Sequence, residues 1–108
     1  MKHRFDFRLE RVRRVRELEE RVARAQRSSA ENLARAAEAS RDRSRAALAR
    51  SRAELEHLLS GSLDARNVLA SQRALDAELV RLRRSVESAR TVRMQAERLA
   101  AVHRERKQ

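Results

Sequence analysis

The chain has 108 residues, enough for a single domain, and it contains one Gly and no Pro. Its formal net charge is +11, spread along the chain, which favours an acidic partner such as an acidic protein, a nucleic acid or an anionic lipid. The absence of Cys excludes disulfides and thiolate metal sites, and no apolar run approaches the ~20 residues needed to cross a bilayer.

Residues 5–59 predict one long helix, because this segment is rich in Ala, Leu, Arg and Glu, which lose little side-chain freedom in a helix. Its first apolar residues recur every three or four positions, the spacing of one helix face. They are Phe5, Leu9, Val12, Val15, Leu18, Val22 and Ala25. Ser28 with Glu31 matches a capping box, but an uninterrupted helix is favoured over a break there.

The apolar stripe becomes thinner between residues 26 and 47, which should be the weakest part of the packing because small side chains bury little area. The best core candidates in this stretch are Ser29, Leu33, Ala36 and Ser40. Larger apolar residues return at Leu48, Leu55, Leu58 and Leu59.

A tight helix–helix turn is predicted at Ser60–Asp64. Gly61 can adopt the left-handed conformation that ends many helices. Ser62 or Asp64 can then cap a second helix by accepting a hydrogen bond from its free backbone N–H groups.

The second helix is predicted over residues 65–104, with a heptad pattern that is interrupted only by Arg93. The pattern comprises Leu75, Leu79, Leu82, Val86, Ala89, Arg93 and Ala96. Arg93 is expected to lay its stem along the interface and place its charge in water. We therefore predict that residues 1–108 form one all-α domain, an antiparallel two-helix coiled-coil hairpin. In this hairpin Arg104 lies near residue 18. The N-terminal apolar residues then have no intramolecular partner.

Residues that could carry catalysis or hold a metal show no recognisable arrangement. His3, His57 and His103 fall at distant levels of the hairpin, and His57 and His103 are expected to be solvated. No Gly-rich loop could hold a phosphate, and no Ser has a base and an orienting group at the required spacing. We therefore expect a protein that is not an enzyme, with no catalytic, cofactor-binding or metal-binding residues.

The opening Phe5-Asp-Phe7-Arg-Leu9-Glu-Arg-Val12 and the Arg- and Glu-rich segment after it, up to Glu20, resemble the start of the FliJ family. The layout is also similar to that family: a long first helix, a Gly-containing turn, and a second helix with Val86-Glu-Ser-Ala89-Arg90 followed by Ala96-Glu-Arg-Leu99. Members usually extend the second helix by some tens of residues, and the end at Gln108 departs from that pattern.

The resemblance implies a cytoplasmic component of the flagellar type III export apparatus, peripheral at the inner membrane. FliJ-like proteins form a stalk that inserts its terminal end into the hexameric export ATPase, FliI, bind the export-gate protein FlhA and assist export chaperones. Carried over to this chain, the ATPase-binding residues would be Phe5, Phe7, Leu9, Val12 and Val15. Leu75, Leu79, Leu82 and Val86 would contact the gate, although the favoured interpretation is that they are coiled-coil core.

Two other functions remain open from the residues alone. One is a generic structural or oligomeric coiled coil. The other is a basic nucleic-acid-binding helix pair, suggested by Arg41, Arg43, Arg45, Arg50 and Arg52 among serines. The lack of aromatic residues on which bases could stack, and the interruption of the basic segment by Asp42 and Glu54, favour a solvated helix face instead.

Overall fold

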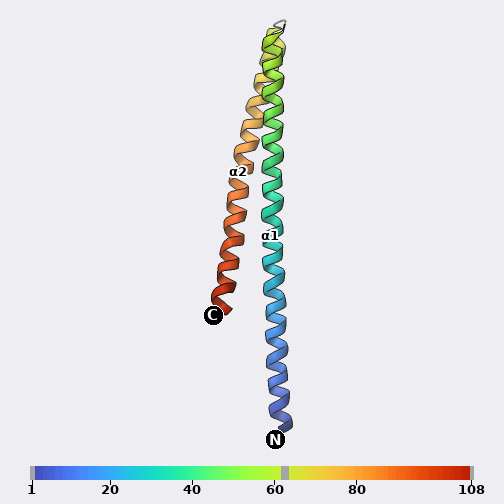
Figure 1. Cartoon of the computed structure of the whole chain (residues 1–108), viewed down its shortest axis with the longest axis vertical. Coiled ribbons are helices and arrows are strands. Elements are labelled where there is room, and N and C mark those ends of the chain that lie inside the picture. The colour runs from blue at the N-terminus through green and yellow to red at the C-terminus, as the bar shows by residue number, and fades with distance from the viewer. Residues whose placement is uncertain (1, 62–63, 108) are drawn as a thin grey trace.

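The computed structural model describes residues 2–61 and 64–107, and the side chains of residues 3–61 and 64–105. Two helices, α1 (Lys2–Ser60) and α2 (Ala65–Lys107), run antiparallel and form a rod with dimensions of 93 × 18 × 15 Å (Figure 1). The described segments contain no strand. The prediction of an all-α two-helix hairpin is confirmed, and both helices extend beyond their predicted ends.

Helix α1 is continuous through Ser28, so the capping-box match there does not begin a new helix. The sequence around Ser28 contains neither Gly nor Pro, and each flanking segment has good helix formers that favour propagation. Propagation adds one backbone hydrogen bond for each residue that is fixed, whereas a break would require a second nucleation step.

The turn lies where it was predicted, but Gly61 does not have the expected left-handed backbone: no Gly among the described residues has a positive φ. Instead, the hydroxyl of Ser60 donates a hydrogen bond of 2.9 Å to the carbonyl of His57. Asp64 is the cap of α2, because its Oδ1 accepts a hydrogen bond of 3.1 Å from the backbone N–H of Arg66. The alternative cap, Ser62, lies outside the described residues.

The side of α1 that packs on α2, here called the seam, follows a strict heptad spacing from residue 23 to residue 58. Its buried and half-buried members are Ala23, Arg27, Ala30, Ala34, Ala37, Arg41, Ser44, Leu48, Ser51, Leu55 and Leu58. Most of them are small or polar, so the contact between the helices buries little apolar area, which stabilises by about 25 cal/mol per Å².

The core prediction for residues 26–47 was wrong by one helical position. Leu33 is 62% exposed, whereas its neighbour Ala34 is completely buried. Ser29 and Ala36 are exposed, and only Ser40 is half-buried. Each step of one residue rotates the side chain by about 100° around the helix. The larger residues near the turn set the heptad phase, and α2 follows this phase along the Ala-rich side of α1.

The predicted apolar residues near the turn are mostly confirmed. Leu48 is buried and Leu55 and Leu58 are half-buried, whereas Leu59 is 52% exposed. On α2 the predicted heptad is confirmed throughout, since Ala89 and Ala96 are buried and the other members are half-buried. A hydrogen bond of 3.1 Å between the hydroxyls of Ser44 and Ser85 crosses the seam.

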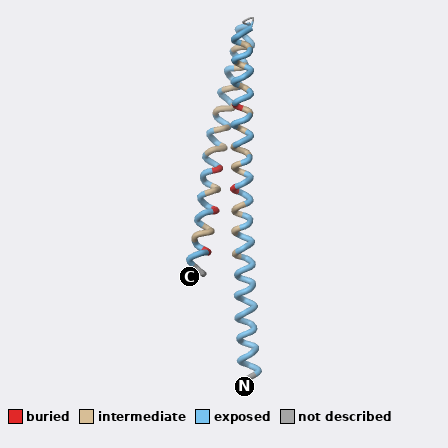
Figure 2. The backbone as a smooth tube through the Cα atoms, in the orientation of Figure 1, coloured by how far each residue is buried: buried red, intermediate tan, exposed pale blue. Residues whose placement is uncertain are grey.

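The N-terminal turns of α1 have no neighbouring helix. Helix α1 continues well beyond the end of α2 in Figure 1, and all side chains from residue 3 to residue 22 are exposed (Figure 2). The last turns of α2 lie beside residues 16–27 of α1, close to the level that was predicted. We call residues 3–22 the overhang.

Candidate functional site

The overhang contains all five residues that the resemblance assigns to ATPase binding. Phe5 and Phe7 are 65% and 67% exposed, and Leu9, Val12 and Val15 are each about half exposed. Phe5, Leu9 and Val12 are spaced by four and three residues, so they lie on one side of the helix. Phe7 is two residues, about 200°, away from Phe5. The two aromatic side chains therefore face opposite sides of α1 and cannot form one patch.

The four residues that were considered for gate binding lie on the seam side of α2. Leu75, Leu79, Leu82 and Val86 are all half-buried, on the side of the helix that also carries the buried Ala89. This position agrees with the interpretation that they belong to the coiled-coil core. A partner could reach most of their surface only if the two helices separated.

Arg93 forms an ion-pair network with two glutamates of α1, and its charge is not simply solvated as predicted. Its Nη1 lies 2.6 Å from Oε2 of Glu31, and its Nε donates a hydrogen bond of 3.1 Å to Oε1 of Glu38, which also pairs with Nη2. Hydrogen bonding to Glu31, and then to Glu38, raises the pKa of Arg93 above its ordinary value. The hydrogen bond from Arg93 lowers the pKa of Glu31 below its ordinary value of 4.5.

His103 was expected to be solvated, but it is only 6% exposed. It occupies the seam near the end of α2, and its Nε2 is buried without a hydrogen-bond partner among the described residues. His57, by contrast, is exposed beside the turn as predicted. The heptad spacing of α2 continues from Ala89 and Ala96 to His103, so extending the predicted stripe by one heptad would have identified this burial.

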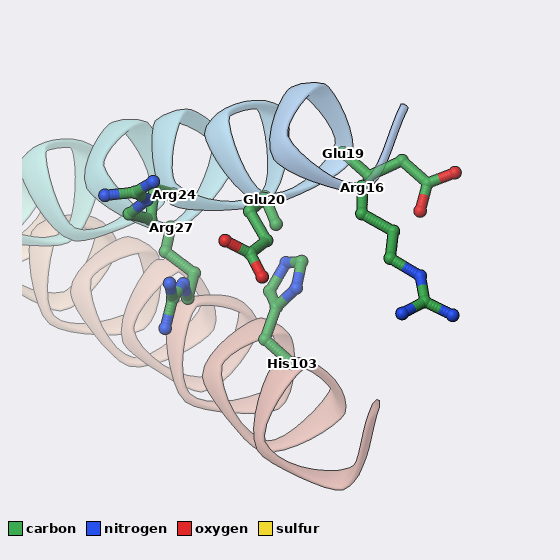
Figure 3. Close-up of a pocket in the computed structure, with 7 residues that line it drawn as sticks. Arg16, Glu19, Glu20, Arg24, Arg27 and His103 are labelled. Carbon is green, nitrogen blue, oxygen red and sulfur yellow. The ribbon is translucent and has the colours of Figure 1, made fainter. Parts of the chain in front are cut away.

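A groove surrounds His103 where the two helices begin to separate. One hollow, of about 420 Å³, is lined by Arg16, Glu19, Glu20, Ala23, Arg24, Arg27 and His103. Figure 3 shows the side chains of Glu20 and His103 pointing toward one another from the two helices, while the Glu19 carboxylate points away from His103. A second hollow, of about 300 Å³, is lined by Leu18, Glu19, Val22, Ala23, Gln26 and His103.

The described side chains contain no group of three or more His, Asp and Glu residues that could hold a metal ion. Within residues 2–61 and 64–107, no helix is long and apolar enough to cross a membrane. The described residues present an exposed helical overhang with exposed apolar side chains.

Comparison with known proteins gives no relative. No family model, no curated protein and no solved structure matches this chain.

Proposed function

We propose that this protein is a non-enzymatic stalk and adaptor of a flagellar type III export apparatus. In this role it binds the hexameric export ATPase and the export gate, and it assists export chaperones. The proposal is supported by the resemblance of residues 5–20 to the FliJ family. The observation that carries it furthest is the overhang, a helical extension that presents Phe5, Phe7, Leu9, Val12 and Val15 to solvent.

The shape of the overhang suits insertion into a ring. A single helix is about 10–12 Å wide with its side chains, much narrower than the double-helical part of the hairpin. Phe5 and Phe7 face opposite sides of this helix, so each can contact a different subunit that surrounds it. Aromatic side chains at such positions commonly contribute a large share of binding energy.

The test is ATP hydrolysis by the cognate export ATPase, with and without this protein, at moderate salt. We expect stimulation, and we expect the double variant Phe5→Ala/Phe7→Ala to weaken the complex by roughly tenfold or more, as loss of interface aromatics does. Met94→Ala is the matched control, because Met94 is 52% exposed but lies on α2, far from the overhang. Equal stimulation by the double variant and the wild-type chain would contradict the proposal.

The same experiment separates the two other functions. Arg43, Arg45, Arg50 and Arg52 are exposed, so nucleic-acid binding would be insensitive to Phe5 and Phe7. It would also fall steeply with salt, because each phosphate contact releases counterions. If the protein neither stimulated the ATPase nor co-purified with it, the remaining function would be that of a structural coiled coil.

A further inference from the structure

The side of the hairpin that carries the Arg93 ion pairs changes its charge toward the turn. On this side Arg93 of α2 pairs with Glu31 and Glu38 of α1. Seven and fourteen residues after Glu38, helix α1 carries Arg45 and Arg52 in place of acidic residues. Residues seven apart lie on the same side of a helix in a heptad coiled coil, so both arginines continue this side of α1 toward the turn.

Helix α2 contributes apolar residues to the same side. Val86 and Leu79 lie seven and fourteen residues before Arg93, so they continue its side of α2 toward the turn. The hydrogen bond between Ser44 and Ser85 shows that the two helices are side by side at this level. Val86 and Leu79 are half-buried, so part of each side chain remains accessible beside the seam.

Two further arginines border the apolar pair on α2. Arg83 is four residues after Leu79, and Arg90 is four residues after Val86, which are neighbouring positions on a helix surface. We call this set of residues the basic flank, and it comprises Arg45, Arg52, Leu79, Arg83, Val86 and Arg90. Its four arginines are exposed, and none of them forms an ion pair with another described side chain.

The positive charge of the basic flank is local. Residues 43–53 of α1 and 79–86 of α2 lie side by side and contain seven arginines but no Asp or Glu. Asp42, the first carboxylate beyond this stretch on α1, is paired with Arg41. Two exposed carboxylates limit the flank toward the turn, Glu56 and Asp76. The electrostatic potential of the flank therefore favours an acidic ligand.

The spacing of the arginines matches one kind of acidic ligand. Arg45 and Arg52 are seven residues apart, which corresponds to about 10.5 Å along the helix axis. Arg83 and Arg90 have the same spacing. Acidic residues that recur every seven positions on a helix present carboxylates at the same distance. The Arg93 network already contains such a ligand pair, because one guanidinium contacts two glutamates that are seven residues apart.

We propose that the basic flank binds an acidic amphipathic helix of another protein, with acidic residues at heptad spacing on both sides of an apolar stripe. The stripe packs on Leu79 and Val86, and the carboxylates pair with the four arginines, whose planar guanidinium groups suit carboxylates. A nucleic acid fits less well, because the flank has no aromatic side chain on which bases could stack. The flank is separate from the overhang, so this proposal does not depend on ATPase binding.

The test uses the full chain and two designed helical peptides of the same composition. In the first peptide, Glu residues flank a Leu stripe at heptad spacing and Gln residues occupy the opposite side. In the second peptide, the Glu and Gln positions are exchanged. Fluorescence anisotropy at moderate salt should show that the first peptide binds roughly fivefold or more tightly than the second. Equal binding of the two peptides would overturn the proposal, because it would show that only net charge is recognised.

Two double variants locate the site. Arg45→Gln/Arg52→Gln should weaken binding of the first peptide by roughly fivefold or more, because two charge pairs are lost. Arg43→Gln/Arg50→Gln removes the same charge at the same spacing. It lies two positions, about 200°, away on α1, where Arg50 lines a hollow with Glu78, and should leave binding within about twofold of wild type. All four positions are exposed, so circular dichroism should show that both variants stay folded.

Other outcomes overturn the proposal. An equal loss of binding in the two double variants would show that the peptide recognises the positive charge of the whole hairpin and not the basic flank. Tighter binding of a single-stranded DNA oligonucleotide than of the first peptide, lost in Arg45→Gln/Arg52→Gln, would assign the flank to a nucleic acid. A dimer in analytical ultracentrifugation that dissociates in the same variant would show that a second copy of this chain occupies the flank.

Discussion

Arg93 combines two roles at the level of a single residue. It occupies a heptad position where an apolar residue is usual, and its guanidinium bridges Glu31 and Glu38, which are seven residues apart on α1. Because seven residues make nearly two turns, both carboxylates lie on the same side of the helix. The network therefore fixes the relative position of the two helices, which a seam of small residues would define only weakly.

The Glu31 carboxylate should make the hairpin sensitive to acid. Its pKa is lowered in the folded state, first through the hydrogen bond from Arg93. A carboxyl with a depressed folded pKa favours the folded state above its unfolded pKa, here close to 4.5, and this contribution is lost as the pH falls through the folded pKa. Glu31→Gln should thus lower the melting temperature at pH 7 more than at pH 3.

Thermal unfolding followed by circular dichroism at the two pH values provides the measurement. Glu56→Gln is a suitable control, because Glu56 is exposed on the same helix. If Glu31→Gln lowered the melting temperature equally at both pH values, the carboxylate would contribute no stabilisation linked to its ionisation.

At the level of the element, α1 has two neighbouring faces with different roles. Between residues 18 and 37, the seam carries small and polar residues, whereas the larger apolar residues Leu18, Val22 and Leu33 face solvent. Leu33 and Ala34 are adjacent in sequence but lie on different faces. The apolar pattern alone predicts that Leu33 packs on α2, whereas in the structure Ala34 occupies that position.

Substitutions at this pair should have opposite consequences. Ala34→Leu should destabilise the hairpin by about 1–3 kcal/mol, because Ala34 is completely buried and a larger side chain must push the helices apart. Leu33→Ala should change the stability by only about 0.5 kcal/mol or less, since Leu33 is 62% exposed. Urea unfolding of the two variants measures both effects, and a larger loss for Leu33→Ala would place Leu33 in the seam.

At the level of the whole molecule, the rod has a double-helical part and a single-helical part. Most of the overhang lies beyond the end of α2, and isolated helices of this length are marginally stable in water. The seam, in contrast, is held by packing, by the Ser44–Ser85 hydrogen bond and by the Arg93 network. The two parts should therefore differ strongly in how often their backbone opens.

Amide hydrogen exchange can detect this difference. Amides of residues 5–22 should exchange at least roughly tenfold faster than those of residues 30–55, because their opening does not require separation of the helices. Binding of a partner to the overhang should slow the exchange of residues 5–22 and leave that of the region near the turn little changed. Uniform protection along α1 in the free protein would contradict the two-part description.

The candidate sites could be predicted from the sequence to different extents. The exposure of Phe5 and Val15 followed from the unequal lengths of the two predicted helices. The burial of His103 was missed because the heptad pattern of α2 was followed only to Ala96, and one further heptad step reaches His103. The pairing of Arg93 with Glu31 and Glu38 was missed because it joins residues that are far apart in the chain.

The sequence by itself determined the two helices, the turn at Ser60–Asp64 and the heptad face of α2, because propensity, capping and periodicity act between residues that are near in the chain. The tertiary structure alone decided which face of α1 meets α2. Two faces of α1 have a helical apolar pattern, and between residues 18 and 37 the one with the larger side chains remains exposed. Which face of α1 packs on α2 depends on the continuity of the seam from Leu48 and Leu55 and on the distance between the two helices. Both are defined only by how the helices are arranged in space.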